Sequence, residues 1–171
     1  PRSTPKPSSA ASDVYKRQLL IGKKFDIVLI LSTAHDGITS VCDTAFYRMP
    51  WGDVPVATDI VNALIKSGKF RYVPTAHERE HGIETQLPFL CFVMSDFKIV
   101  PVVVGADAEG EEKSLAYALL DATKGKNVLV VVSTDLTHFP NHSAAKKVED
   151  QFLEVVKTLN ARKIKETAAR L

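Results

Sequence analysis

The chain has 171 residues, 45 % of them hydrophobic, and a formal net charge of +2, which together predict one domain with enough apolar material for a core. The charge is spread along the chain without a basic stripe or an aromatic ladder, which argues against nucleic-acid binding. No apolar run reaches the roughly 18 residues that a membrane helix needs, and Cys42 and Cys91 form no CxxC pair. We therefore expect a cytoplasmic protein with free thiols and no membrane association.

The two ends differ from the rest of the chain. Residues 1–18 are rich in proline, serine and alanine, show no periodicity and lack the apolar core of a signal peptide. We expect them to be a disordered or artefactual tail. The chain begins with proline instead of methionine, and its last residues stop within a helical pattern. We therefore expect residues 19–171 to form a single α/β domain that is truncated at both ends.

The first predicted strand is the apolar run from Phe25 to Leu31, FDIVLIL, which is typical of a strand buried on both faces. It opens into a polar segment that contains His35. Ligands of open α/β sheets lie beyond the carboxyl ends of the strands, so His35 is a candidate metal ligand. A metal site of this kind usually needs three protein ligands. The alternative is that His35 only satisfies a loop carbonyl.

An irregular hairpin is predicted over residues 39–57, because this stretch alternates loosely and contains two prolines and the turn at Trp51 and Gly52. Cys42, within it, is predicted to be a half-buried structural thiol. A helix follows from Thr58 to Ser67, with apolar residues at helical intervals, Thr58 as its cap and Gly68 as its stop.

The segment His77-Glu78-Arg79-Glu80-His81 matches the H-E-x-x-H pattern. On a helix this spacing places two imidazoles on one face beside a general base, as in zinc peptidases. The flanks argue against that interpretation. Pro74 precedes the string and Gly82 follows it, and glycine disfavours helix interiors by about 1 kcal/mol.

A different segmentation fits the same residues better. A loop ends at Gly82, and a helix begins there with apolar residues facing the core. Pro88 is tolerated in the first turns of such a helix or at a kink. His81 and Glu84 would then lie at the start of the helix and line a pocket. Alternatively, Glu84 is an exposed first-turn acid that the helix dipole favours.

The second half of the chain continues the alternation of predicted strands and helices. A buried strand is predicted from Phe97 to Val104, with Pro101 implying an edge or irregular position, and a helix from Glu111 to Thr123. A third strand, also predicted to be buried on both faces, is the valine-rich run Val128–Val132, and the longest helix spans Ser143–Asn160. The order of strands and helices favours an α/β fold with a largely parallel sheet and helices on both faces.

An acid and an imidazole, Asp135 and His138, directly follow the third strand. This position beyond a carboxyl strand end makes them candidate catalytic residues. The alternative is that Asp135 caps a turn and His138 is a surface loop histidine. If His35 and His138 end neighbouring strands of one sheet, they can converge on one cavity.

Several strings resemble one known family. They are AHEREHGIETQLPFL from Ala76, IVPVVVGA from Ile99, VVSTDLTHF from Val131, and STAH from Ser32 with the segment Met49–Val56. In order and spacing they are similar to the Memo family (mediator of ErbB2-driven cell motility), which includes AmmeMemoRadiSam system protein B. The resemblance runs from about Asp26 to Asn160.

The resemblance implies a fold and a site. The fold would be a three-layer α/β/α sandwich similar to class III extradiol dioxygenases, with a non-haem iron or copper pocket. In that family the metal ligands are two histidines and a late cysteine, and His35 matches the second histidine. Asp135 and His138 match the pair beside the metal, where an imidazole suits proton transfer. No histidine precedes His35, and Cys42 and Cys91 do not match the late cysteine, so we expect this fragment to bind metal weakly or not at all.

The functional reading that the resemblance implies is redox or oxygen chemistry on a small molecule, with the reaction itself unassigned. Radical-SAM and AMMECR1-type proteins would be partners. A second reading is a non-catalytic module that keeps the dioxygenase fold and binds a peptide or scaffolds partners, because a fold does not determine a function. A zinc peptidase built on His77, Glu78 and His81 is the third.

Overall fold

The computed structural model describes residues 18–134 and 142–170 and divides into two compact units, Pro1–Ser133 and Thr134–Leu171. The first unit contains, in order, η1 (Gln18–Leu20), β1 (Ile27–Thr33), β2 (Ser40–Val41), β3 (Phe46–Met49), β4 (Gly52–Pro55), α2 (Thr58–Lys66), α3 (Pro74–Glu78), α4 (Leu87–Val93), β5 (Lys98–Val104), η2 (Ala106–Ala108), α5 (Glu112–Ala122) and β6 (Val128–Ser133). The second contains α6 (His142–Lys157) and α7 (Ala161–Ala168).

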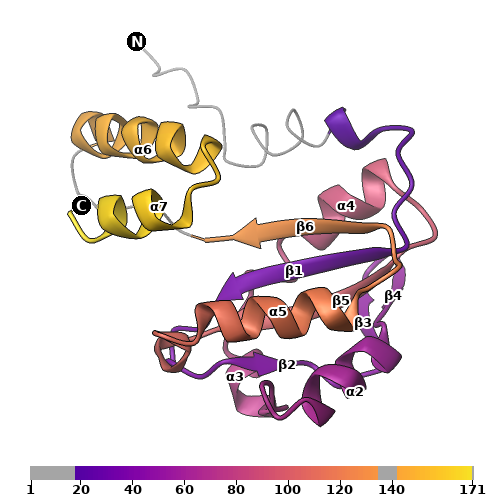
Figure 1. Cartoon of the computed structure of the whole chain (residues 1–171). Helices are drawn as coiled ribbons and strands as arrows, with labels where there is room; N and C mark the ends of the chain where they lie inside the picture. Colours follow the sequence, from indigo (N-terminus) through magenta and orange to yellow (C-terminus); the bar gives the residue numbers. More distant parts are fainter. Residues whose placement is uncertain (1–17, 135–141, 171) are drawn as a thin grey trace. The chain divides into compact units, whose positions relative to one another are not determined.

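The first unit is organised around a four-stranded sheet in the order β2-β5-β1-β6. β1 pairs in parallel with β5 and with β6, and only the short β2 is antiparallel. Four successive residues of β1, Ile27 to Ile30, are buried. Because successive side chains of a strand point to opposite faces, both faces of the sheet are covered at β1. At the edge strand β6, Val130 and Val132 are 54 % and 65 % exposed, so the prediction that this strand is buried on both faces is wrong. Figure 1 shows α5 in front of the sheet and α4, drawn fainter, behind it. The predicted α/β/α sandwich with a mostly parallel sheet is confirmed.

β5 lies between β2 and β1, so the edge position that Pro101 suggested is wrong. The carbonyl of Pro101 accepts a hydrogen bond of 3.2 Å from the backbone N–H of Cys42, on the β2 side. The nitrogen and carbonyl of one strand residue point to the same neighbour, so the missing N–H of proline also faces β2. β2 pairs with β5 only at Val102 and Val103, and Pro101 therefore removes no hydrogen bond to β1.

The elements around the sheet match the sequence with two shifts. α2 buries Ile60, Val61 and Leu64, but its cap residue is Ala57, and Thr58 is its first residue. The hairpin is shorter than the predicted 39–57, because Ser40 and Val41 pair with β5 and only β3 and β4 form the hairpin. After its turn, Gly52 has φ 138°, a conformation that side chains disfavour.

The Pro74–Met94 segment differs more from the prediction. Residues 74–78 form the short helix α3, with Pro74 in its first turn, where the missing N–H has no cost. Residues 82–86 are a turn, and α4 begins only at Leu87, with Pro88 in its first turn. Leu87 and Leu90 are buried as predicted.

The second unit has two helices, one over most of the predicted Ser143–Asn160 helix and one within the helical pattern of the last residues. α6 ends at Lys157, and Leu159 adopts φ 52°, which a continuing helix does not allow. Asn160 caps α7 by accepting a hydrogen bond of 3.0 Å from the backbone N–H of Lys163. Among the described residues, no helix has the length and apolar character needed to cross a bilayer.

Candidate functional site

The carboxyl ends of β1 and β6 are covered by the loop between α3 and α4. A Cβ atom at Gly82 would lie 2.0 Å from the Ser32 hydroxyl oxygen and 3.4 Å from that of Ser133. Nε2 of Gln86 donates a hydrogen bond of 3.1 Å to the Ser133 hydroxyl. Only glycine permits this approach, so the loop is held directly against the edge of the sheet where ligands bind in open α/β folds.

The carboxylate of Glu80, in the same loop, contacts two polar groups of His35, the backbone N–H and the imidazole. Nδ1 of His35 lies 2.9 Å from Oε2 of Glu80, and the backbone N–H of His35 donates to Oε1. The Glu80 side chain is 5 % exposed, whereas that of His35 is 65 % exposed. An ionised carboxylate can only accept, so Nδ1 carries the proton. The nitrogen through which this imidazole would bind a metal is then Nε2, on the opposite side of the ring.

Backbone contacts fix the loop that carries His35 against the loop after β5. Ala34 N–H donates to the Val104 carbonyl at 3.0 Å, and Asp107 N–H donates to the Gly37 carbonyl at 3.1 Å. A Cβ atom at Gly105 would lie 2.1 Å from the carbonyl carbon of Gly37. These contacts hold the backbone at His35 in place before any ligand binds.

His81 and Glu84 lie on the turn beside Glu80. His81 is exposed and Glu84 is half-buried. Burial raises the pKa of Glu84, and the negative charge of Glu80 raises it further. A hydrogen bond from the backbone of Glu84 and the charge of His81 act in the opposite direction but do not cancel the rise. Glu84 therefore feels the charges of both His81 and Glu80, and of these three side chains Glu80 contacts His35.

His77 does not belong to this group. Its Nε2 lies 3.1 Å from the hydroxyl of buried Ser40, its Nδ1 is buried without a hydrogen-bond partner, and burial lowers its pKa. α3 ends at Glu78, so His77 and His81 do not share a helix, and His81 is exposed. The zinc-peptidase interpretation is wrong because its two imidazoles need one continuous helix face.

Asp135 and His138 lie outside the described residues, and their position relative to His35 stays a prediction. The strand that leads to them, β6, is present and adjacent to β1 as predicted. Within the described part of the chain, no cluster of three or more histidine, cysteine, aspartate or glutamate side chains has the arrangement of a metal site. Cys42 is buried rather than half-buried, and both cysteines are free thiols.

The sequence did not single out Glu80. It stood inside the H-E-x-x-H string as one of the variable positions, and nothing in the pattern showed that its carboxylate would be buried. Its partner is 45 positions away. The only available signal was its place next to His81 in the string that carries the family resemblance.

These observations define a three-layer α/β protein with a histidine–carboxylate pair at the carboxyl edge of a parallel sheet. The family model described as Memo-like protein matches residues 6–171. The chain therefore belongs to the Memo-like family. The family match begins at residue 6, whereas the resemblance of the individual strings begins only at about Asp26.

Curated relatives agree with this assignment. The chain is 34 % identical over 147 residues to a MEMO1 family protein of Thermotoga neapolitana, covering 83 % of this chain and 53 % of the relative. A MEMO1 family protein of Methanobrevibacter smithii is 35 % identical over 147 residues, with 82 % and 52 % covered. One from Archaeoglobus fulgidus is 30 % identical over 139 residues, with 79 % and 52 % covered. The chain spans about half the length of the curated relatives it matches.

Proposed function

We propose that this chain contributes part of a non-haem metal pocket to a cytoplasmic Memo-family protein that carries out redox or oxygen chemistry on a small molecule. The observation that supports this proposal is the contact between His35 and Glu80. Metal-binding histidines donate their second ring N–H to a carboxylate, which fixes the tautomer and orients the ring. Nδ1 of His35 has such a partner, and the partner is buried.

The residues present fit one ligand and its orienting carboxylate. His35 would hold the metal through Nε2, and Glu80 would keep the proton on Nδ1. Iron or copper bound there would supply a Lewis acid or a redox centre. His81 and Glu84 are proposed to line the substrate side of this pocket, and the raised pKa of Glu84 favours its protonated form.

Asp135 and His138 are the proposed acid–base pair, with His138 as the group that moves the proton. Their place in the chain, directly after a strand paired with β1, supports this role. Radical-SAM and AMMECR1-type proteins are the proposed partners, on the family resemblance alone.

The experiment is metal analysis of a full-length form that contains this segment. Wild type, His35→Ala and Glu78→Gln are purified in parallel, reconstituted with iron or copper, and measured by elemental analysis and by a spectroscopic titration. We expect His35→Ala to lose most of its metal and Glu78→Gln to retain it, because Glu78 is exposed and lies outside the pair.

Equal metal content in wild type and His35→Ala would overturn the proposal and leave the fold as a binding module. Loss in the Glu78→Gln variant alone would contradict the assignment of the pocket to His35. Circular dichroism of each variant establishes that the comparison is made between folded proteins.

A further inference from the structure

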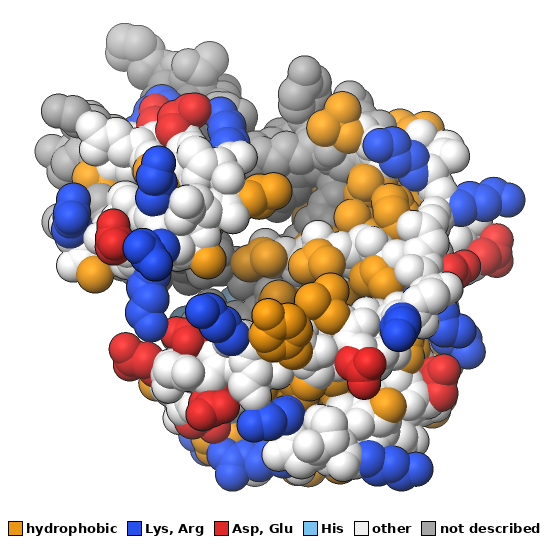
Figure 2. All heavy atoms as spheres, in the orientation of Figure 1, with side chains coloured by type: hydrophobic (Ala, Val, Ile, Leu, Met, Phe, Trp, Pro, Cys, Tyr) orange, Lys and Arg blue, Asp and Glu red, His pale blue; other side chains and the backbone are white. Residues whose placement is uncertain are grey.

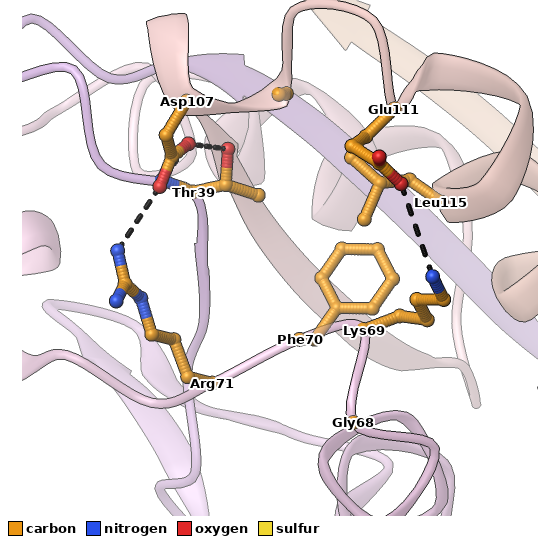
Figure 3. Close-up of a pocket in the computed structure, with 9 residues that line it drawn as sticks. Thr39, Gly68, Lys69, Phe70, Arg71, Asp107, Glu111 and Leu115 are labelled. Atoms are coloured by element: carbon orange, nitrogen blue, oxygen red, sulfur yellow. Dashed lines mark hydrogen bonds and ion pairs between the residues drawn. The ribbon is translucent and has the colours of Figure 1, made fainter.

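A second cavity, of about 450 Å³, is lined by residues 68–71, which follow α2, and by side chains of η2 and α5 (Figure 3). Its lining contains none of the residues His35, His81 and Glu84. The volume lies in the range of small-molecule pockets. The inference that follows does not depend on the proposed metal pocket.

Charges of both signs face this cavity in matched pairs. Nη2 of Arg71 lies 3.0 Å from Oδ2 of Asp107, and Nζ of Lys69 lies 3.8 Å from Oε2 of Glu111. The two cations come from one segment and the two acids from the opposite one. Figure 3 shows the Phe70 ring between Lys69 and Arg71. The cavity thus offers positive charge, negative charge and an apolar surface within one small volume.

In one of the two pairs the acid is anchored by further hydrogen bonds, whereas its partner Arg71 is 63 % exposed. Oδ1 of Asp107 accepts a hydrogen bond of 2.8 Å from the backbone N–H of Thr39 and another from the Thr39 hydroxyl. Burial works to raise the pKa of Asp107, but these hydrogen bonds and the charge of Arg71 outweigh it and lower that pKa. The Thr39 hydroxyl also accepts from the backbone N–H of Gly105 at 3.0 Å. This network fixes one rim of the cavity.

The other pair is loose. Side chains of Lys69 and Glu111 are 48 % and 61 % exposed, and their separation is near the limit of an ion pair. Exposed pairs of this kind contribute little to stability, so either side chain can turn toward a ligand at small cost. The cavity therefore combines one fixed carboxylate, that of Asp107, with an adaptable pair of charges.

The pairing of charges decides the class of ligand. A phosphate would meet the carboxylates of Asp107 and Glu111, and a metal cation would meet Lys69 and Arg71. A ligand with both charges has neither conflict. We propose that this cavity binds a free α-amino acid with an apolar side chain. Its carboxylate lies toward Lys69, its ammonium group toward Glu111, and its side chain against Leu115 and the small exposed part of Phe70.

The test is a titration of this chain, followed by calorimetry or by NMR shifts, with three probes of similar shape. They are L-leucine, 4-methylpentanoate, which lacks the ammonium group, and 3-methylbutylamine, which lacks the carboxylate. We expect leucine to bind at least about tenfold more tightly than either single-charge probe, because each charged contact is lost in one of them. Equal affinity for leucine and either probe would overturn the proposal, and so would the absence of saturable leucine binding at millimolar concentration.

Matched variants locate the site. Lys69→Met and Glu111→Gln are each expected to weaken leucine binding about tenfold or more, and Lys69→Arg is expected to retain it. Lys66→Met and Glu112→Gln change exposed neighbours that do not line the cavity and are expected to bind leucine as wild type does. All five replace exposed side chains, so thermal unfolding should remain near that of wild type. Leucine binding that is unchanged in Lys69→Met and Glu111→Gln would place the ligand elsewhere and overturn the proposal.

Discussion

The carboxylate of Glu80 accepts hydrogen bonds from both the backbone N–H and the imidazole Nδ1 of His35. These two contacts join the loop after β1 to the loop between α3 and α4. The Glu80 side chain is almost fully buried, so these contacts tie an exposed histidine to a buried carboxylate. The pair therefore has a structural role that can be measured independently of any metal.

Replacing Glu80 tests that role. Glu80→Ala is expected to lower the free energy of unfolding by about 1–3 kcal/mol, since it removes the acceptor of two part-buried hydrogen bonds. Glu80→Gln keeps one carbonyl acceptor and should cost about half as much. Urea unfolding measures both, with Glu78→Ala, an exposed acid of the same segment, as the control. A Glu80→Ala variant as stable as the control would show that the contact contributes nothing.

Gly82 should not tolerate a larger residue. In Gly82→Ala the new Cβ would lie 2.0 Å from the Ser32 hydroxyl oxygen and 3.2 Å from the Ser32 Cβ. Ser32 is buried, so we expect a loss of about 1–3 kcal/mol in chemical denaturation. The double variant Ser32→Ala/Gly82→Ala removes the shorter contact and should recover part of that loss. If it recovered none, the clash with Ser32 would not be the cause.

The stability of the chain should depend on pH through His77. Burial lowers its pKa from the ordinary value of 6.5, so the unfolded chain binds a proton before the folded chain does. The stabilisation is present above pH 6.5 and is lost as the pH falls from there toward the lowered pKa. His77→Gln removes this dependence. The free energies of unfolding of wild type and His77→Gln, measured between about pH 8 and pH 5, should approach each other as the pH falls. A constant difference between them across this range would contradict the assignment to His77.

Two leucines provide a test of the packing. Leu87, at the start of α4, is 0 % exposed, and Leu120, on α5, is 67 % exposed. Leu87→Ala should lower the free energy of unfolding by about 2–5 kcal/mol because it leaves a cavity in the core. Leu120→Ala should stay within about 0.5 kcal/mol of wild type. Similar losses for both would mean that α5 is covered by something else in solution. Figure 2 shows apolar side chains on the face over α5 and β6.

The positions of β1, β5 and β6 and of helices α2 and α5 follow from the sequence alone. Apolar runs of strand length such as Ile27–Leu31 can be satisfied only between two covering layers, and helical spacing such as Ile60, Val61 and Leu64 predicts a single buried face. For the same reason the sequence places His35 at the carboxyl end of β1. The family resemblance also rests on short motifs that can be recognised in the sequence without a structure.

Only the tertiary structure decided which polar groups meet. Glu80 reaches His35 across 45 positions, and Asp107 reaches Thr39 across 68. The paired ions beside Phe70 come from two segments that α3, α4 and β5 separate in the chain. Local propensity carries no information about such pairs, because burial and partner are set by how the loops close over the sheet. Pro101 is a second example, because the sequence does not show which neighbouring strand its nitrogen faces, and this decides whether a hydrogen bond of the sheet is lost.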